Sequence, residues 1–250
     1  MKKIMSLLTL ASLVWLVTAC QPANDEQPQP EQTISEEEAA ELVETAMGSN
    51  TEGMSAEAEN AAAMAAGSYD SNGNALVDCG ETNDTTLSYN RNLPNGYVNY
   101  TNDIQWTLEC NQLNVPVQMQ YVGDASGGFE TYRSMGSFTA LTAFDLSGIA
   151  PAQPEYVING LYTFDGTVQG KGVGIGSSQL EGTYTLTLEI TAENVTFDKD
   201  AFEITGGTAT FVLTVSVDDG VPVTIEGSIE FLGNGDATVV INGETFDIDL

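Results

Sequence analysis

The stretch TYTLTLEI, residues 183–190, decides the fold class of this chain. Its apolar residues Tyr184, Leu186, Leu188 and Ile190 alternate strictly with threonines and a glutamate. Successive side chains of a β-strand point to opposite faces of a sheet, so this alternation predicts a strand with one buried and one solvated face. The same period of two recurs along most of the chain after residue 85. Further alternating apolar sets are Val98, Tyr100, Ile104, Trp106, Leu108 and Cys110; Val115, Val117, Met119 and Tyr121; Ala209, Phe211, Leu213, Val215 and Val217; and Phe246, Ile248 and Leu250.

Turn-forming residues separate these runs, and Asn242-Gly243 is the strongest hairpin pattern among them. Strands joined by tight turns are antiparallel neighbours. The sequence therefore predicts a mainly β fold, an antiparallel up-and-down meander of about ten strands. Because open sheet edges favour aggregation, we expect a half-barrel, a closed barrel or a two-layer sheet. The other predicted turns are Asp165-Gly166, Gly206-Gly207, Asp218-Asp219-Gly220 and Gly233-Asn234-Gly235.

A pair of helices is predicted before the strands, over residues 35–68. Ser35 and Glu38 have the spacing of a capping box, and acidic residues in the first turn suit the helix dipole. Gly48 is expected to end this first helix, and the second is predicted from Ser55 to Ala66. The face of the second helix consists mainly of small residues, so the pair buries little area alone and must lie on another element. It could cover an open mouth or face of the sheet. The predicted helix faces are Ala39, Leu42, Val43, Ala46 and Met47, and Ala58, Ala61, Ala62, Met64 and Ala65.

The N-terminal residues have the layout of a secretory signal. Lys2 and Lys3 precede an apolar run from Ile4 to Val17, which is shorter than a membrane span of about 20 residues. The run ends in Val17-Thr18-Ala19-Cys20, which resembles the lipobox of bacterial lipoproteins. The resemblance implies that Cys20 is the acylated first residue of the mature protein. We therefore expect a lipid-anchored protein of the bacterial cell envelope, attached to the membrane through its acyl chains.

The chain is expected to divide into a signal peptide at 1–19, the lipidated cysteine with a disordered tether at 20–34, the helical segment at 35–68 and a β domain at 69–250. Pro151 and Pro154 mark a seam near 150–155. Gln21 follows the cysteine where enteric lipoproteins held at the inner membrane carry Asp, which implies delivery to the outer membrane. In layout, the whole chain is similar to uncharacterised β-rich lipoproteins of Bacteroidetes.

Composition excludes several classes of function. The formal net charge is −30, which repels phosphate backbones, so we expect no nucleic-acid partner. The chain has no histidine, which removes catalytic triads and zinc sites that depend on this residue. We accordingly expect no enzymatic activity and no obligatory cofactor.

The remaining cysteines, Cys79 and Cys110, predict a disulfide in an exported protein. Residues 70–81 also resemble an EF-hand calcium loop, with oxygen-bearing side chains at places one, three, five, nine and twelve. The sixth place is Ala75 instead of glycine, and no helix is expected to follow, so a polar connector is the alternative interpretation. The candidate calcium ligands are Asp70, Asn72, Asn74, Asp78 and Glu81.

Three functional hypotheses follow from these observations. The first is an envelope lipoprotein whose β module serves binding or structure. The second is a carrier or sensor of an apolar ligand held in a concave half-barrel, as in lipoprotein-sorting factors. The third is a glycan hydrolase that works with paired carboxylates.

Overall fold

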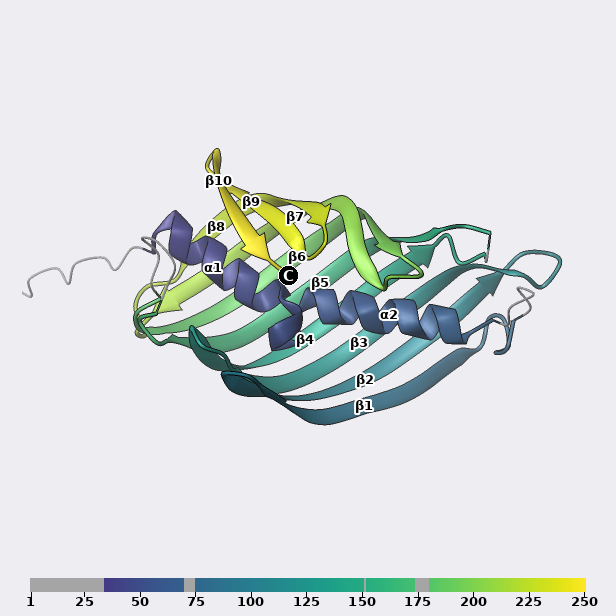
Figure 1. Cartoon of the computed structure of the whole chain (residues 1–250), viewed down its shortest axis with the longest axis horizontal. Helices are drawn as coiled ribbons and strands as arrows, with labels where there is room; N and C mark the ends of the chain where they lie inside the picture. Colours follow the sequence, from purple (N-terminus) through teal and green to yellow (C-terminus); the bar gives the residue numbers. More distant parts are fainter. Residues whose placement is uncertain (1–33, 70–74, 151, 174–179) are drawn as a thin grey trace, which may run out of the picture. The chain divides into compact units, whose positions relative to one another are not determined.

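The computed structural model describes residues 34–69, 75–150, 152–173 and 180–250, which belong to one compact unit, Gln32–Leu250. Two α-helices and a short 3-10 helix come first, and strands follow to the end of the chain (Figure 1). The helices are α1 (Glu36–Met47), η1 (Ser49–Thr51) and α2 (Met54–Gly67). The strands are β1 (Thr82–Leu93), β2 (Gly96–Cys110), β3 (Pro116–Glu130), β4 (Ser134–Ser147), β5 (Glu155–Gly170), β6 (Thr183–Asp198), β7 (Glu203–Val217), β8 (Val223–Gly233), β9 (Asp236–Ile241) and β10 (Glu244–Asp249).

The strands form one ten-stranded antiparallel sheet in the order of the sequence, β1 to β10. This confirms the predicted up-and-down meander. The sheet is open, with β1 and β10 as its edges, and it curves around the helices, which lie on its concave side (Figure 1). Helix α1 contacts β9 and β10, whereas α2 contacts β3, β4, β5 and β7.

The alternating pattern places the core between the sheet and the helices. Tyr184, Leu186, Leu188 and Ile190 of the opening stretch are all buried, as their period of two requires. Helix α2 presents alanines to the sheet, and small side chains allow its backbone to approach the strands closely. Buried alanines of α2 are Ala56, Ala58, Ala61, Ala62 and Ala65.

The predicted capping box at the start of α1 is confirmed. The Ser35 hydroxyl accepts a bond from the Glu38 amide at 3.2 Å, and the Glu38 carboxylate accepts one from the Ser35 amide at 2.9 Å. Gly48 ends the helix, as expected. Glu52 follows in a left-handed conformation with φ 59°. Its Oε1 lies 2.7 Å from Nη2 of Arg91, and this ion pair links the turn between the helices to β1.

Two predicted turns are wrong. Asp165-Gly166 lies inside β5 and Gly206-Gly207 lies inside β7. At Gly166 the missing side chain makes room for an aromatic ring, since an added Cβ would lie 2.8 Å from Phe164. At Gly206-Gly207 the register between β6 and β7 shifts, and Gly207 has a φ of 115° that suits glycine.

Val117 also departs from its predicted face, because it is 44% exposed whereas Met119 and Tyr121 are buried. The pairing of β2 with β3 shifts between Glu109 and Cys110, so that Cys110 lies opposite Pro116. This bulge inserts one residue into β3 and turns Val117 outward.

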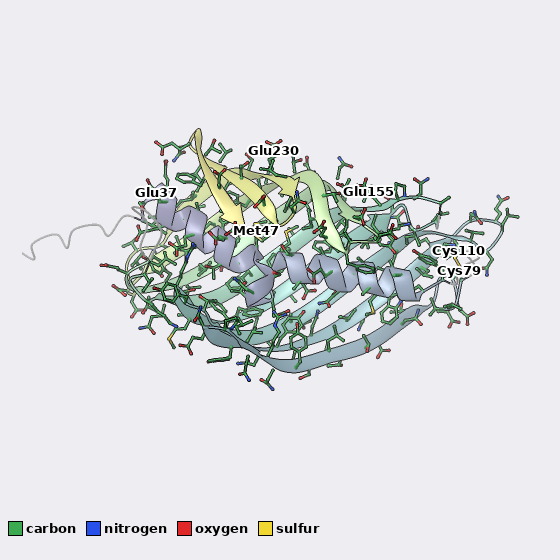
Figure 2. The ribbon with its side chains drawn as sticks, viewed as in Figure 1. Glu37, Met47, Cys79, Cys110, Glu155 and Glu230 are labelled. Carbon is green, nitrogen blue, oxygen red and sulfur yellow. A yellow bond between two sulfur atoms is a disulfide. The ribbon has the colours of Figure 1, made fainter. Side chains whose placement is uncertain are left out.

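The disulfide between Cys79 and Cys110 is present, with the Cα atoms 5.8 Å apart (Figure 2). It ties the segment between α2 and β1 to the end of β2. At another loop, the Lys199 ammonium donates to the carbonyls of Gly148 at 2.6 Å, Ile149 at 3.2 Å and Ala150 at 3.0 Å. This lysine therefore holds the connection between β4 and β5 in place.

Candidate ligand-binding recess

The described structure reaches only part of the sites predicted from the sequence. Asp78 and Glu81 are exposed, and no group of three acidic or cysteine side chains among the described residues lies closely enough to hold a metal ion. The calcium loop therefore stays a prediction. Outside the described residues lie the lipidation residue Cys20 and the other three calcium candidates, Asp70, Asn72 and Asn74.

A buried carboxylate that the sequence did not single out lies between α2 and the sheet. Glu57 is 0% exposed. One of its oxygens accepts a hydrogen bond from the Tyr100 hydroxyl and one from the Asn102 amide at 2.9 Å. Its other oxygen accepts from the Tyr121 hydroxyl at 2.8 Å and from the Asn102 amide at 3.1 Å. Gly123 leaves room for this cluster, because an added Cβ would lie 2.7 Å from Glu57 Oε2.

This cluster joins α2 to the strands and leaves no free carboxylate oxygen for a ligand. Burial raises the pKa of Glu57, and the hydrogen bonds from Tyr100, Tyr121 and Asn102 oppose that rise only in part. Four hydrogen bonds converge on two oxygens, so the acceptor capacity of the carboxylate is used within the protein. We therefore assign Glu57 a structural role.

A different set of carboxylates lines open space beside α1. Glu37, Glu41 and Glu44 fall at positions i, i+4 and i+7 of this helix and so share one face. Glu41 and Glu44 border two recesses, of about 360 and about 560 Å³, whereas Glu37 borders only the larger one. The two recesses share Glu41, Glu44, Arg133 and Asp249. Figure 2 labels Glu37 on α1. We call the combined space the acidic recess; its charged residues are Glu37, Glu41, Glu44, Asp236, Asp247, Asp249 and Arg133.

Three elements bring these charges together. Helix α1 supplies three carboxylates, and the loop between β3 and β4 supplies Arg133. The paired strands β9 and β10 supply the others, and Asp236 lies directly opposite Asp249 in their register. Like charges opposite each other in a sheet are destabilising, so the fold tolerates a locally unfavourable arrangement at this place.

Arg133 compensates only part of this negative charge. Its guanidinium lies 3.2 Å from a carboxylate oxygen of Glu44. Burial raises the pKa of Glu44 to about 7, an effect that Arg133 opposes and that Asp249 and Glu41 increase. Glu44 therefore titrates near neutral pH.

Glu41 is the exceptional residue of the acidic recess. Glu41 lines both parts of this recess. It is only 7% exposed, and neither of its carboxylate oxygens has a hydrogen-bond partner. Burial raises the pKa of Glu41, and the nearby Arg133 opposes that rise. A buried carboxyl group without a partner is costly, and it is a group that a suitable ligand would satisfy.

The sequence contained a weak indication of this site. Acidic residues at 37, 41 and 44 repeat at helical spacing, which is unfavourable for an isolated helix because like charges then face each other. The opposing acids of β9 and β10 could not be placed beside them, because that contact joins the first helix to the last two strands of the chain.

Comparison of the chain with protein-family models, curated proteins and solved structures finds no match in any of the three.

Within the described residues, no helix is long and apolar enough to cross a membrane.

Proposed function

We propose that this chain is a lipid-anchored lipoprotein of a bacterial cell envelope whose folded body is a ligand-binding module. Acyl chains on Cys20 would hold the body at the membrane, most simply the outer membrane, and the acidic recess would be its binding site. The sequence at Val17–Cys20 supports the anchor. No polybasic patch is available to help, so the acyl chains would provide the membrane affinity.

One observation carries the binding part of the proposal. Glu41 is a buried carboxylate without a partner, and it borders open space. The concave side of the sheet, by contrast, is packed against α1 and α2. A site beside α1 requires no rearrangement of this packing, which favours the recess over the interior.

The anchor is tested by a Cys20→Ala variant expressed in a host that processes lipoproteins. The variant should leave the membrane pellet and lose labelling by a fatty-acid analogue, whereas wild type keeps both. The binding part is tested by a thermal-shift panel on the detergent-solubilised full chain, with a neutral disaccharide, citrate, calcium and spermidine as probes. A compound that raises the midpoint of wild type but not of Glu41→Gln supports the module, and a panel without such a compound contradicts it.

Hydrolysis of glycans is the second candidate. It is favoured by Glu44, whose pKa is raised to about 7 in a recess that also holds Asp249. Glycosidases use a pair of carboxyl groups, one of which has a raised pKa and donates the proton. The ion pair between Glu44 and Arg133 weighs against this role, since it occupies the group that would donate the proton. Turnover of a reporter glycoside by wild type but not by Glu44→Gln would support the hydrolase.

Transport of an apolar ligand would need a different state of the protein. The helices would have to leave the concave side of the sheet for a lipid to reach the buried apolar residues. Lipid that co-elutes with the purified full chain would support a carrier.

A further inference from the structure

We propose that the acidic recess binds a small organic polycation, an extended molecule with two or more ammonium groups, and that Glu41 is the buried counter-charge for one of them. This inference rests on the proposed function, because it names the class of ligand for the same site. It is argued from the charge, the size and the unsatisfied group of the recess.

The charge of the recess calls for a cation. Six carboxylates line the larger of the two spaces, and Arg133 is the only basic residue among its lining residues. Asp236 and Asp249 lie opposite each other, and Glu37, Glu41 and Glu44 share one face of α1. A bound cation would relieve the repulsion among these groups, and the unbound protein retains it.

Glu41 shows where one positive group would lie. Its oxygens are buried and have no hydrogen-bond donor, although Arg133 is near enough to lower its pKa. An ammonium group has three donors and no acceptor, so it matches a carboxylate whose acceptor positions are empty. Arg133 is engaged with Glu44, which leaves Glu41 available to the ligand.

The spacing of the acids distinguishes an extended organic cation from a metal ion. A metal needs several oxygen ligands at one point. Among the described residues, no three acidic side chains converge in this way. The carboxylates are instead distributed over two spaces of about 360 and about 560 Å³ that share lining residues, and each has a size that suits small organic ligands.

The experiment measures spermidine binding to the detergent-solubilised full chain by isothermal titration calorimetry. Wild type is compared with Glu41→Gln, which keeps the shape of the side chain and removes its charge. The matched control is Glu230→Gln, which makes the same change at an exposed position of β8 outside the lining of the recess (Figure 2). A protein of net charge −30 attracts polyamines over its whole surface, and the control accounts for that attraction.

We expect saturable binding to wild type, a loss of affinity of about tenfold or more in Glu41→Gln, and a change of less than about twofold in Glu230→Gln. Equal affinities of the two variants would overturn the inference, because binding would then be non-specific. Tight calcium binding that depends on Glu41, without spermidine binding, would also overturn it. That result would leave the proposed binding module intact and show that its ligand class is wrong. Binding of a disaccharide or citrate that is lost in Glu41→Gln would have the same meaning. Urea curves of both variants establish that each is folded.

Discussion

Replacement of Glu57 by alanine should destabilise the protein by about 3–7 kcal/mol. The substitution would leave the hydroxyls of Tyr100 and Tyr121 without their acceptor in a place that solvent does not reach, whereas the Asn102 amide keeps its bond to the Tyr100 hydroxyl at 2.8 Å. Each orphaned buried donor costs about 1–3 kcal/mol. The lost side-chain atoms add about 1 kcal/mol for the remaining cavity. Since domains are stable by about 5–15 kcal/mol, the loss would be severe.

Glu57→Gln is the milder change, and we expect it to cost about 1–3 kcal/mol. The amide keeps the shape and one acceptor oxygen, and a tyrosine hydroxyl can rotate to accept from the new NH₂ group. The assay is urea unfolding followed by far-UV circular dichroism with the disulfide intact. Glu59→Gln is the matched control, because Glu59 lies on the same helix and is exposed; it should change stability by less than about 0.5 kcal/mol. A Glu57→Ala protein as stable as this control would refute the reasoning.

The same variants test the protonation of Glu57. Its pKa is raised by burial from the ordinary value of 4.5, so the folded protein holds this proton over a pH range in which the unfolded chain has lost it. The contribution of Glu57 to stability is then complete below pH 4.5 and declines as pH rises through the folded pKa. Glutamine has no such proton. The advantage of wild type over Glu57→Gln should therefore shrink as pH rises above 4.5, and a constant difference in urea curves would contradict this.

Three further predictions concern packing and loop connections. Gly123→Ala should destabilise wild type by about 1–3 kcal/mol, because the new Cβ would lie 2.7 Å from Glu57 Oε2. The same substitution should cost less in a Glu57→Ala background, and additive losses of stability would argue against the contact. Double replacement of Cys79 and Cys110 by alanine should cost about 3–4 kcal/mol by urea unfolding, as expected for a cross-link that spans 31 residues, and a reductant should then have no further effect. Lys199→Met should cost about 1–3 kcal/mol and speed amide hydrogen exchange around the connection between β4 and β5, because three carbonyls lose their donor; unchanged exchange there would count against it.

Much of the fold could be predicted from local patterns. The period of two gave the strands, and turn residues gave their antiparallel order, because both depend on neighbours in the chain. The capping box of Ser35 and Glu38 likewise lies within a few residues. Asp165-Gly166 failed as a turn because glycine there serves the packing of Phe164, a contact that depends on the assembled sheet.

The polar groups of the interior were harder to predict. Asn102 lies on the apolar face of β2 between Tyr100 and Ile104, and this break in the alternation was the available sign of a buried polar partner. Nothing in the local sequence distinguished Glu57 as a buried residue, because it stands among alanines in a chain with many acidic residues. The burial of Glu41 could not be predicted either. It depends on strands that follow about two hundred residues later, and a local sequence pattern carries no information on such a contact.

The packing of α1 against the last strands has a consequence for biosynthesis. Every strand pairs with its immediate predecessor, so the sheet can extend hairpin by hairpin as the chain emerges. The first helix cannot complete its own burial in this way, because it packs on β9 and β10, the last two strands of the chain. A product truncated before β9 would leave the side of α1 that packs on β9 and β10 open to proteases and chaperones, so full burial of this helix requires completed synthesis.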